Sequence, residues 1–142
     1  MKKLIIIPFL LFLIFSCDKN DVIDNLDYNV IGEWNWTRTD GGIAFHIHET
    51  PESTGKSIQI KLTNNYEFTL TENDNEILNG SYELSLERSI YSGELEKFIR
   101  LSENCQYQNI VLNGIVSVIS DDTLTISDNS YDGIGSTFIR KK

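Results

Sequence analysis

The segment His46-Ile47-His48-Glu49 is the local group of side chains with the clearest potential for metal chemistry. Residues two apart on a β-strand point to the same face, so the imidazoles of His46 and His48 could bind one metal ion together. A zinc site needs three or four protein ligands, and these are the only two histidines in the chain. Glu49 would point to the opposite face of the strand. We therefore predict a solvated loop or edge strand and no metal site, unless the fold supplies a third ligand.

Other catalytic arrangements are missing from the sequence. It has no Ser-His-Asp order, no phosphate-binding loop and no Cys-x-x-Cys pair. The acidic pairs Glu94/Glu96 and Asp121/Asp122 lie in polar, turn-like stretches that offer no environment for acid–base catalysis. Cys105 has no His or Asp at a suggestive spacing, and we interpret it as a structural thiol. The sequence therefore predicts neither an enzyme nor a cofactor.

A second chemically distinctive residue is Cys17, which ends an apolar N-terminal segment. Two lysines follow Met1, and the twelve residues 4–15 are then apolar. This stretch is too short to span a bilayer core as a helix, but it has the length of the hydrophobic region of a signal peptide. The next residues complete the tetrapeptide Ile14-Phe15-Ser16-Cys17, which resembles a bacterial lipobox.

The lipobox resemblance implies both processing and an anchor. It implies that residues 1–16 are a signal peptide, that cleavage occurs before Cys17, and that this cysteine carries palmitate-like acyl chains. Two or three such chains would hold the protein on a membrane, because each buried methylene contributes about 0.8 kcal/mol. We thus expect a lipoprotein of the cell envelope, anchored to the outer membrane on its periplasmic side or at the cell surface. The alternative is a plain secretory signal followed by a chance cysteine.

The chain that remains after residue 16 is strongly acidic. Loss of Lys2 and Lys3 leaves 10 of the 12 basic residues against 21 acidic ones, a net charge of −11. Such a surface repels nucleic acid, which proteins bind mainly through cationic contacts to phosphate. With Cys17 lipidated, Cys105 is the only remaining thiol, so no intramolecular disulfide is expected. The remaining length corresponds to one domain of ordinary size.

Residues 17–28 and 29–142 differ in their pattern. Residues 17–28 are rich in Asp and Asn without a hydrophobic period, which predicts the lipidated cysteine followed by a flexible acidic tether. From residue 29 onward, apolar and polar residues alternate between Asn-, Asp- and Gly-rich turns, which indicates antiparallel strands. The predicted strands are Val30–Thr39, Ser57–Leu62, Tyr66–Thr71, Ser81–Leu86, Lys97–Leu101, Ile110–Ile119, Thr123–Ser127 and Ser136–Arg140. Eight sequential strands favour an all-β, eight-stranded antiparallel up-and-down barrel, because closure removes exposed strand edges.

The first predicted strand contains Gly32-Glu33-Trp34, and this Gly-x-Trp triplet resembles the lipocalin signature. The C-terminal Thr137-Phe138-Ile139-Arg140 is similar to the last strand of lipocalin domains. The resemblance implies a calycin-type barrel in which Arg140 packs over Trp34 and closes one end, with Gly32 beside them. The domain 29–142 as a whole resembles the lipocalin-like lipoproteins of Bacteroidetes.

A barrel of this size either holds one small ligand or is filled by side chains. If a cavity exists, we expect Trp36, Tyr66, Phe68 and Tyr82 to line its open end. The leading hypothesis is therefore non-catalytic binding of a small hydrophobic or amphipathic ligand. The alternative is a filled barrel whose loops contact a protein or glycan, and an exposed apolar patch within residues 41–55 would favour that alternative.

Overall fold

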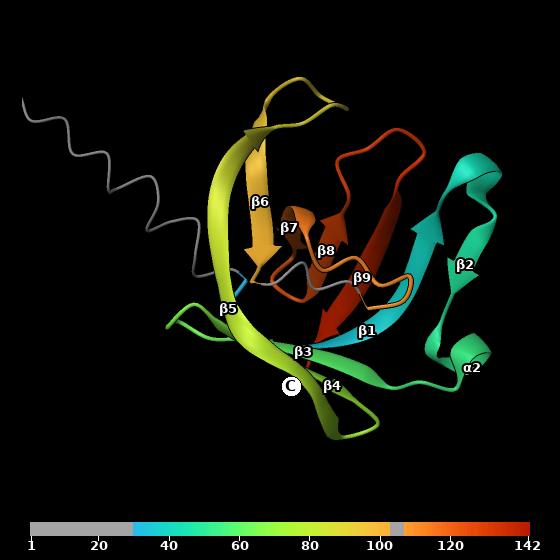
Figure 1. Cartoon of the computed structure of the whole chain (residues 1–142), viewed down its shortest axis with the longest axis vertical. Coiled ribbons are helices and arrows are strands. Elements are labelled where there is room, and N and C mark those ends of the chain that lie inside the picture. The colour runs from blue at the N-terminus through green and yellow to red at the C-terminus, as the bar shows by residue number, and fades with distance from the viewer. Residues whose placement is uncertain (1–29, 103–106) are drawn as a thin grey trace, which may run out of the picture.

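The computed structural model describes residues 30–102 and 107–142, which form an almost all-β domain (Figure 1). The predicted signal peptide (1–16), the segment with Cys17 and the tether (17–28), and Cys105 lie outside the described residues. Within the described part, no helix is long and apolar enough to cross a membrane. The elements in chain order are β1 (Gly32–Gly41), the 3-10 helix η1 (Ile43–Phe45), β2 (Ile47–Glu49), α2 (Pro51–Thr54), β3 (Ile58–Leu62), β4 (Glu67–Glu72), β5 (Asn75–Arg88), β6 (Leu95–Leu101), β7 (Gly114–Ile119), β8 (Thr123–Ser127) and β9 (Ile134–Arg140).

Eight of these strands form a closed antiparallel barrel. β1 and β3 to β9 pair with their neighbours in up-and-down order, and β9 also pairs with β1, from Trp34 opposite Arg140 to Gly41 opposite Ile134. This arrangement confirms the predicted eight-stranded up-and-down barrel, and it is consistent with a lipocalin-like architecture. The remaining strand, β2, is a short edge strand that pairs with the end of β1.

Alternation along the strands places one row of side chains in the barrel interior. In β3, Ile58, Ile60 and Leu62 are buried, while Lys61 between the last two is exposed. The same alternation operates in β4 and β8, because successive side chains of a strand point to opposite faces. The buried core consists of Val30, Trp34, Trp36, Ile58, Ile60, Leu62, Phe68, Leu70, Tyr82, Ile99, Leu101, Ile110, Val111, Leu112, Val116, Leu124, Ile126 and Phe138.

The longest strand, β5, takes part in two successive pairings. Residues 75–81 pair with β4 and residues 82–88 pair with β6, and the strand curves strongly between them (Figure 1). Asn73 and Asp74 before it have φ angles of 50° and 65°, as a two-residue hairpin turn requires. This tight turn lets β5 begin at Asn75, well before the start that was predicted at Ser81.

The predicted strand Ile110–Ile119 is in fact two segments. β7 begins at Gly114, and the apolar residues 110–112 form a buried segment before it. The φ angle of Gly114 is +155°, and a Cβ atom there would collide with the carbonyl oxygen of Ser127. Glycine therefore permits a sharp bend at this point. As a result, the apolar run packs into the core and does not extend the sheet.

Candidate functional site

The four aromatic residues predicted to line a cavity lie mostly within the packed core. Trp36, Phe68 and Tyr82 are buried. The indole N–H of Trp36 donates to Thr39 Oγ1 at 3.0 Å, and the hydroxyl of Tyr82 donates to a backbone carbonyl oxygen at 2.7 Å. Tyr66 differs, since it lies in the turn before β4 and is 41% exposed, with its ring centroid 5.6 Å from that of Tyr82. The contacts of the three buried side chains are those of core residues.

A buried hydroxyl network holds the segment 110–112 against the barrel wall. Ser136 Oγ lies 2.7 Å from Thr39 Oγ1 and accepts the backbone N–H of Val111 at 2.8 Å. Both hydroxyl groups are buried. Each polar atom of the network has a hydrogen-bond partner, so burying this segment carries little desolvation penalty. At this level the barrel interior is occupied by side chains.

The end of the barrel near the last residues of β9 is covered by Arg140. Its guanidinium lies over the Trp34 ring, 4.0 Å from the ring centroid, as in a cation–π contact. Arg140 Nε also donates to Asp121 O at 2.6 Å, and Trp34 Nε1 donates to Val30 O at 2.8 Å. A Cβ atom at Gly32 would overlap the Arg140 guanidinium, so glycine leaves room for it. The structure thus places Gly32, Trp34 and Arg140 in one contact group.

The two histidines do not share a strand face. β2 begins after His46, whose Nδ1 lies 2.7 Å from Ile43 O. His48 is on β2, and its Nδ1 lies 2.5 Å from Asp40 Oδ1. Among residues 30–102 and 107–142, no group of three or more His, Cys, Asp or Glu side chains is placed to hold a metal ion.

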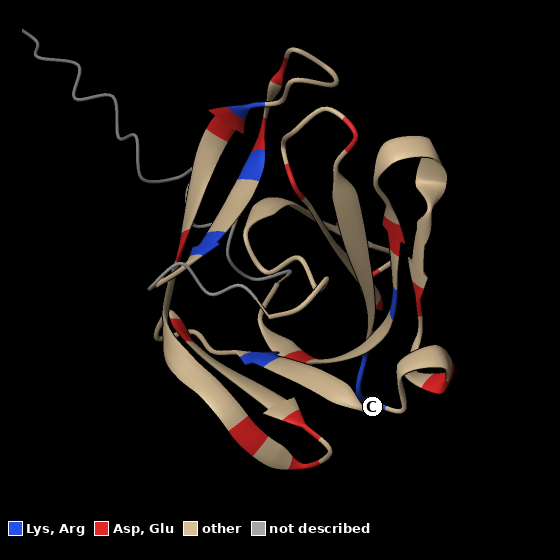
Figure 2. Ribbon diagram, turned by 45° about the vertical axis from the view of Figure 1, so that its right-hand side comes forward, with Lys and Arg blue, Asp and Glu red and all other residues tan. Residues whose placement is uncertain are grey.

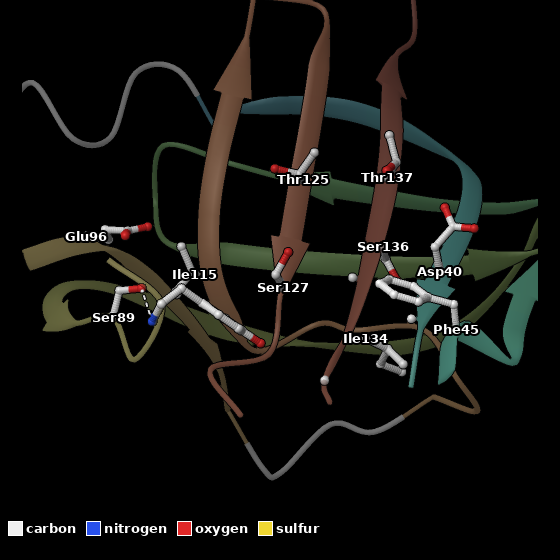
Figure 3. A pocket seen from close by; sticks show the side chains of 14 residues that line it. Asp40, Phe45, Ser89, Glu96, Ile115, Thr125, Ser127, Ile134, Ser136 and Thr137 are labelled. Carbon is white, nitrogen blue, oxygen red and sulfur yellow. Dashed lines mark hydrogen bonds between the residues drawn. The ribbon is translucent and has the colours of Figure 1, made fainter. Parts of the chain in front are cut away.

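A groove of about 440 Å³ lies on the outer face of the barrel over β8 and β9 (Figure 3). Thr125 and Ser127 of β8 alternate with buried residues of the same strand, so their side chains point outward into the groove. Thr137 of β9 lies between the buried residues Ser136 and Phe138, so its side chain also points outward into the groove. Ile115 and Gly135 complete the floor. The floor is therefore rich in hydroxyl groups, with one apolar side chain and one glycine.

One wall of the groove is the tip of the β5–β6 hairpin (89–94), which is held against the β8–β9 loop. Tyr91 Oη donates to Ser130 O at 2.5 Å, and Ile90 N donates to Asn129 Oδ1 at 2.9 Å. Figure 1 shows both segments at the same end of the molecule. These bonds join parts of the chain that are distant in sequence, so the wall exists only in the folded domain.

The opposite wall is η1 with the side chain of Phe45. Gly42 N donates to Gly133 O at 3.0 Å, which fixes this segment beside the β8–β9 loop. Ala44 and Phe45 have φ angles of 57° and 52°, in the left-handed region that costs roughly 1–2 kcal/mol for residues with a Cβ atom. Phe45 is nevertheless 86% exposed. The aromatic side chain of Phe45 is therefore accessible at this wall of the groove.

The groove carries negative charge. Asp40 and Glu96 lie on opposite sides of it (Figure 3), and none of the described residues that line it is Lys, Arg or His. Asp128 and Asp132 in the β8–β9 loop lie close enough to Tyr91 to act on its ionisation. Figure 2 shows acidic segments on the β5–β6 hairpin, in the β8–β9 loop and near the end of β1. Cationic side chains contact its walls without lining it, since Arg38 Nε is 3.1 Å from Asp40 Oδ2 and Arg88 Nη1 donates to Gly93 O in the β5–β6 hairpin.

We expect Tyr91 to titrate above the ordinary tyrosine value. Its ring is exposed, but burial of its hydroxyl against the β8–β9 loop raises the pKa, and the charges of Asp128 and Asp132 raise the pKa further. The raised pKa stabilises the fold below pH 10, and this contribution is lost as the pH rises through the folded-state value. The pKa of Tyr91 is measured by following the tyrosine ring carbon signals by NMR as the pH is raised, with the Tyr91 signal assigned through the Tyr91→Phe variant.

The Asp128→Asn variant is the control for this titration. We expect it to lower the Tyr91 pKa, because one of the two acidic charges is removed. A Tyr91 pKa at or below 10.0 in the unmodified chain would contradict an acidic rim at this groove.

This groove was not predicted from the sequence. Its lining comes from β1, η1, the β5–β6 hairpin and β6 to β9. Residues such as Thr125 and Thr137 look in sequence like ordinary solvent-facing positions of strands. The one available signal was a pair of lone aromatic residues in turn segments, Phe45 after Gly41-Gly42 and Tyr91 before Ser92-Gly93.

No protein-family model matches the chain, and neither a curated protein nor a solved structure matches it.

Proposed function

We propose that this chain is a non-catalytic binding protein of the cell envelope, anchored to the outer membrane through lipid on Cys17. Its lipocalin-like barrel presents a site for a small hydrophobic or amphipathic ligand. The lipobox-like segment 14–17 supports the anchor. The closed eight-stranded barrel supports a binding domain, since such barrels serve as rigid supports for ligand sites.

The outer groove is the observation that carries the binding proposal. Its volume of about 440 Å³ lies in the range of small-molecule sites. Phe45 and Tyr91 supply apolar surface at its two walls, while Thr125, Ser127 and Thr137 supply polar atoms on its floor. That combination suits an amphipathic molecule. The buried aromatics Trp36, Phe68 and Tyr82 act in this proposal as the packed support of the site.

A second candidate function is an interaction module for a protein or glycan. The exposed pair Ile43 and Phe45 on η1 favours it, because these side chains are 70% and 86% exposed. They lie within residues 41–55, the region in which an exposed apolar patch was expected for that alternative.

Native mass spectrometry tests the leading proposal. The full chain, extracted from the membranes of its own host in a neutral detergent, is expected to carry a small molecule that is lost on denaturation. Phe45→Ala is expected to reduce the bound fraction. Tyr131→Ala is the matched control, because Tyr131 is 83% exposed but does not line the groove.

A mass that shows no adduct, and gains none from an extract of host lipids, would contradict small-ligand binding. That result would leave the interaction module as the better explanation of the exposed residues on η1.

A further inference from the structure

We propose that the outer groove binds a small organic cation with an apolar body, such as a protonated amine attached to an aromatic or alkyl group. This inference rests on the proposed binding function and names the class of ligand. The groove is a built feature of the fold, since the β5–β6 hairpin, η1 and the β8–β9 loop are hydrogen-bonded together around it.

Charge selects a cation over a neutral or anionic ligand. Asp40 already contacts Arg38 and His48, at 3.1 and 2.5 Å. Glu96, across the groove, instead accepts a hydrogen bond from the neutral hydroxyl of Ser92, so its negative charge is not offset by that contact. A carboxylate in a partly enclosed site attracts a cation more strongly than one in bulk water. Hydrogen bonds between an ammonium group and a carboxylate are among the stronger ones in proteins.

The floor of the groove provides further acceptors for N–H donors. Ser127 and Thr137 present hydroxyl oxygens on the floor between Glu96 and Asp40 (Figure 3). Gly135 lies beside them, and a Cβ atom at this position would come within 2.9 Å of Ser127 Oγ. The absence of a side chain at residue 135 therefore keeps this part of the floor open. An ammonium group placed here would meet neutral oxygens below it, with the carboxylate of Glu96 on one side of the groove.

The walls provide contact for the apolar body of the ligand. Phe45 and Tyr91 offer ring faces and edges, and Ile115 and Ile134 offer aliphatic surface. Aromatic faces attract cations, by about 0.5–1 kcal/mol at exposed sites. The Phe45 ring is 86% exposed, so it is available to a ligand at the rim of the groove.

Three probes with one ring and different charge test the proposal: benzylamine, benzyl alcohol and benzoate. Each is titrated at pH 7 into the full chain in neutral detergent, and binding is followed through the amide NMR signals of Ser127 and Gly135. We expect protonated benzylamine to bind about tenfold more tightly than benzyl alcohol, the ratio that one partly screened carboxylate contributes. We expect benzoate not to bind. Raising the salt concentration should reduce the preference for the amine.

Matched variants separate charge from apolar contact. Glu96→Gln is expected to remove most of the preference for benzylamine over benzyl alcohol. Glu83→Gln removes the same charge from an exposed position of β5 outside the groove, and it should leave the preference unchanged. Phe45→Ala should weaken the binding of benzylamine and of benzyl alcohol by a similar factor, whereas Tyr131→Ala should leave the binding of both unchanged.

The outcomes also separate this inference from the proposed function. Equal binding of benzylamine and benzyl alcohol at Ser127 and Gly135 would overturn the cation proposal and leave the groove as a site for amphipathic ligands. Absence of any shift with all three probes would overturn the cation proposal as well. In that case the native mass measurement still decides independently whether the chain binds a small molecule.

Discussion

Replacing Trp34 with alanine is expected to lower the free energy of unfolding by ~3–5 kcal/mol, the usual cost of emptying a buried Trp site. Trp34 is fully buried, its ring carries the Arg140 guanidinium at 4.0 Å, and its indole N–H is bonded to Val30 O. A domain of this size has a total stability of roughly 5–15 kcal/mol. Urea denaturation of the full chain, followed by circular dichroism, measures the change.

Two further variants define what Trp34 contributes. Tyr131→Ala removes an aromatic ring that is exposed, and we expect it to change stability by less than about 0.5 kcal/mol. Arg140→Met keeps an unbranched, largely apolar side chain but removes the cation over the ring and the hydrogen bonds to Asp121 O and Ile31 O, so we expect an intermediate loss. A loss below about 1 kcal/mol for Trp34→Ala would show that the ring does not hold this end of the barrel together.

The barrel itself was predictable because its signals are local. Alternating residues such as Ile58, Ile60 and Leu62 reveal a strand with one buried face, whichever strand it pairs with. The Asn73-Asp74 pair reveals the turn between two strands, because these residues tolerate the left-handed backbone that a tight hairpin needs. Repetition of these two signals along the chain is enough to predict an up-and-down order.

The buried segment 110–112 was not predictable in the same way. Ile110, Val111 and Leu112 are apolar and β-branched or aliphatic, so in sequence they extend the strand that follows. Their position depends on Gly114 and on the bond from Val111 N to Ser136 Oγ. Such a contact between residues distant in sequence leaves no periodic trace. The same reason explains why the tip of the β5–β6 hairpin could not be placed beside the β8–β9 loop.

The two faces of β9 connect the buried core of the described residues with the outer groove. Ser136 points inward and holds Val111 and Thr39, while its neighbours Gly135 and Thr137 face the groove. A ligand in the groove would therefore lie on the outer side of the strand that fixes the internal segment. A ligand that binds the folded state but not the unfolded state stabilises the folded state by mass action. A true ligand of the groove should therefore also raise the midpoint temperature of unfolding.

Replacing Cys17 with alanine is expected to move the protein from the membrane fraction to the soluble fraction. The lipobox-like sequence predicts that its thiol carries the acyl chains, and each methylene buried in the bilayer contributes about 0.8 kcal/mol. Two or three chains therefore give an anchor that washing does not remove, and loss of the thiol removes all of them at once. Fractionation of host cells grown with labelled palmitate measures both location and acylation.

Cys105→Ala is the matched control for this experiment, because Cys105 is the only other cysteine in the chain. We expect this variant to stay in the membrane fraction and to keep the palmitate label. If the label persists in Cys17→Ala, acylation occurs elsewhere and the lipobox interpretation is wrong. If the unmodified chain is soluble and unlabelled, residues 1–16 act as a plain secretory signal. The groove would then work in a freely diffusing protein, because the described residues that line it lie between Asp40 and Thr137.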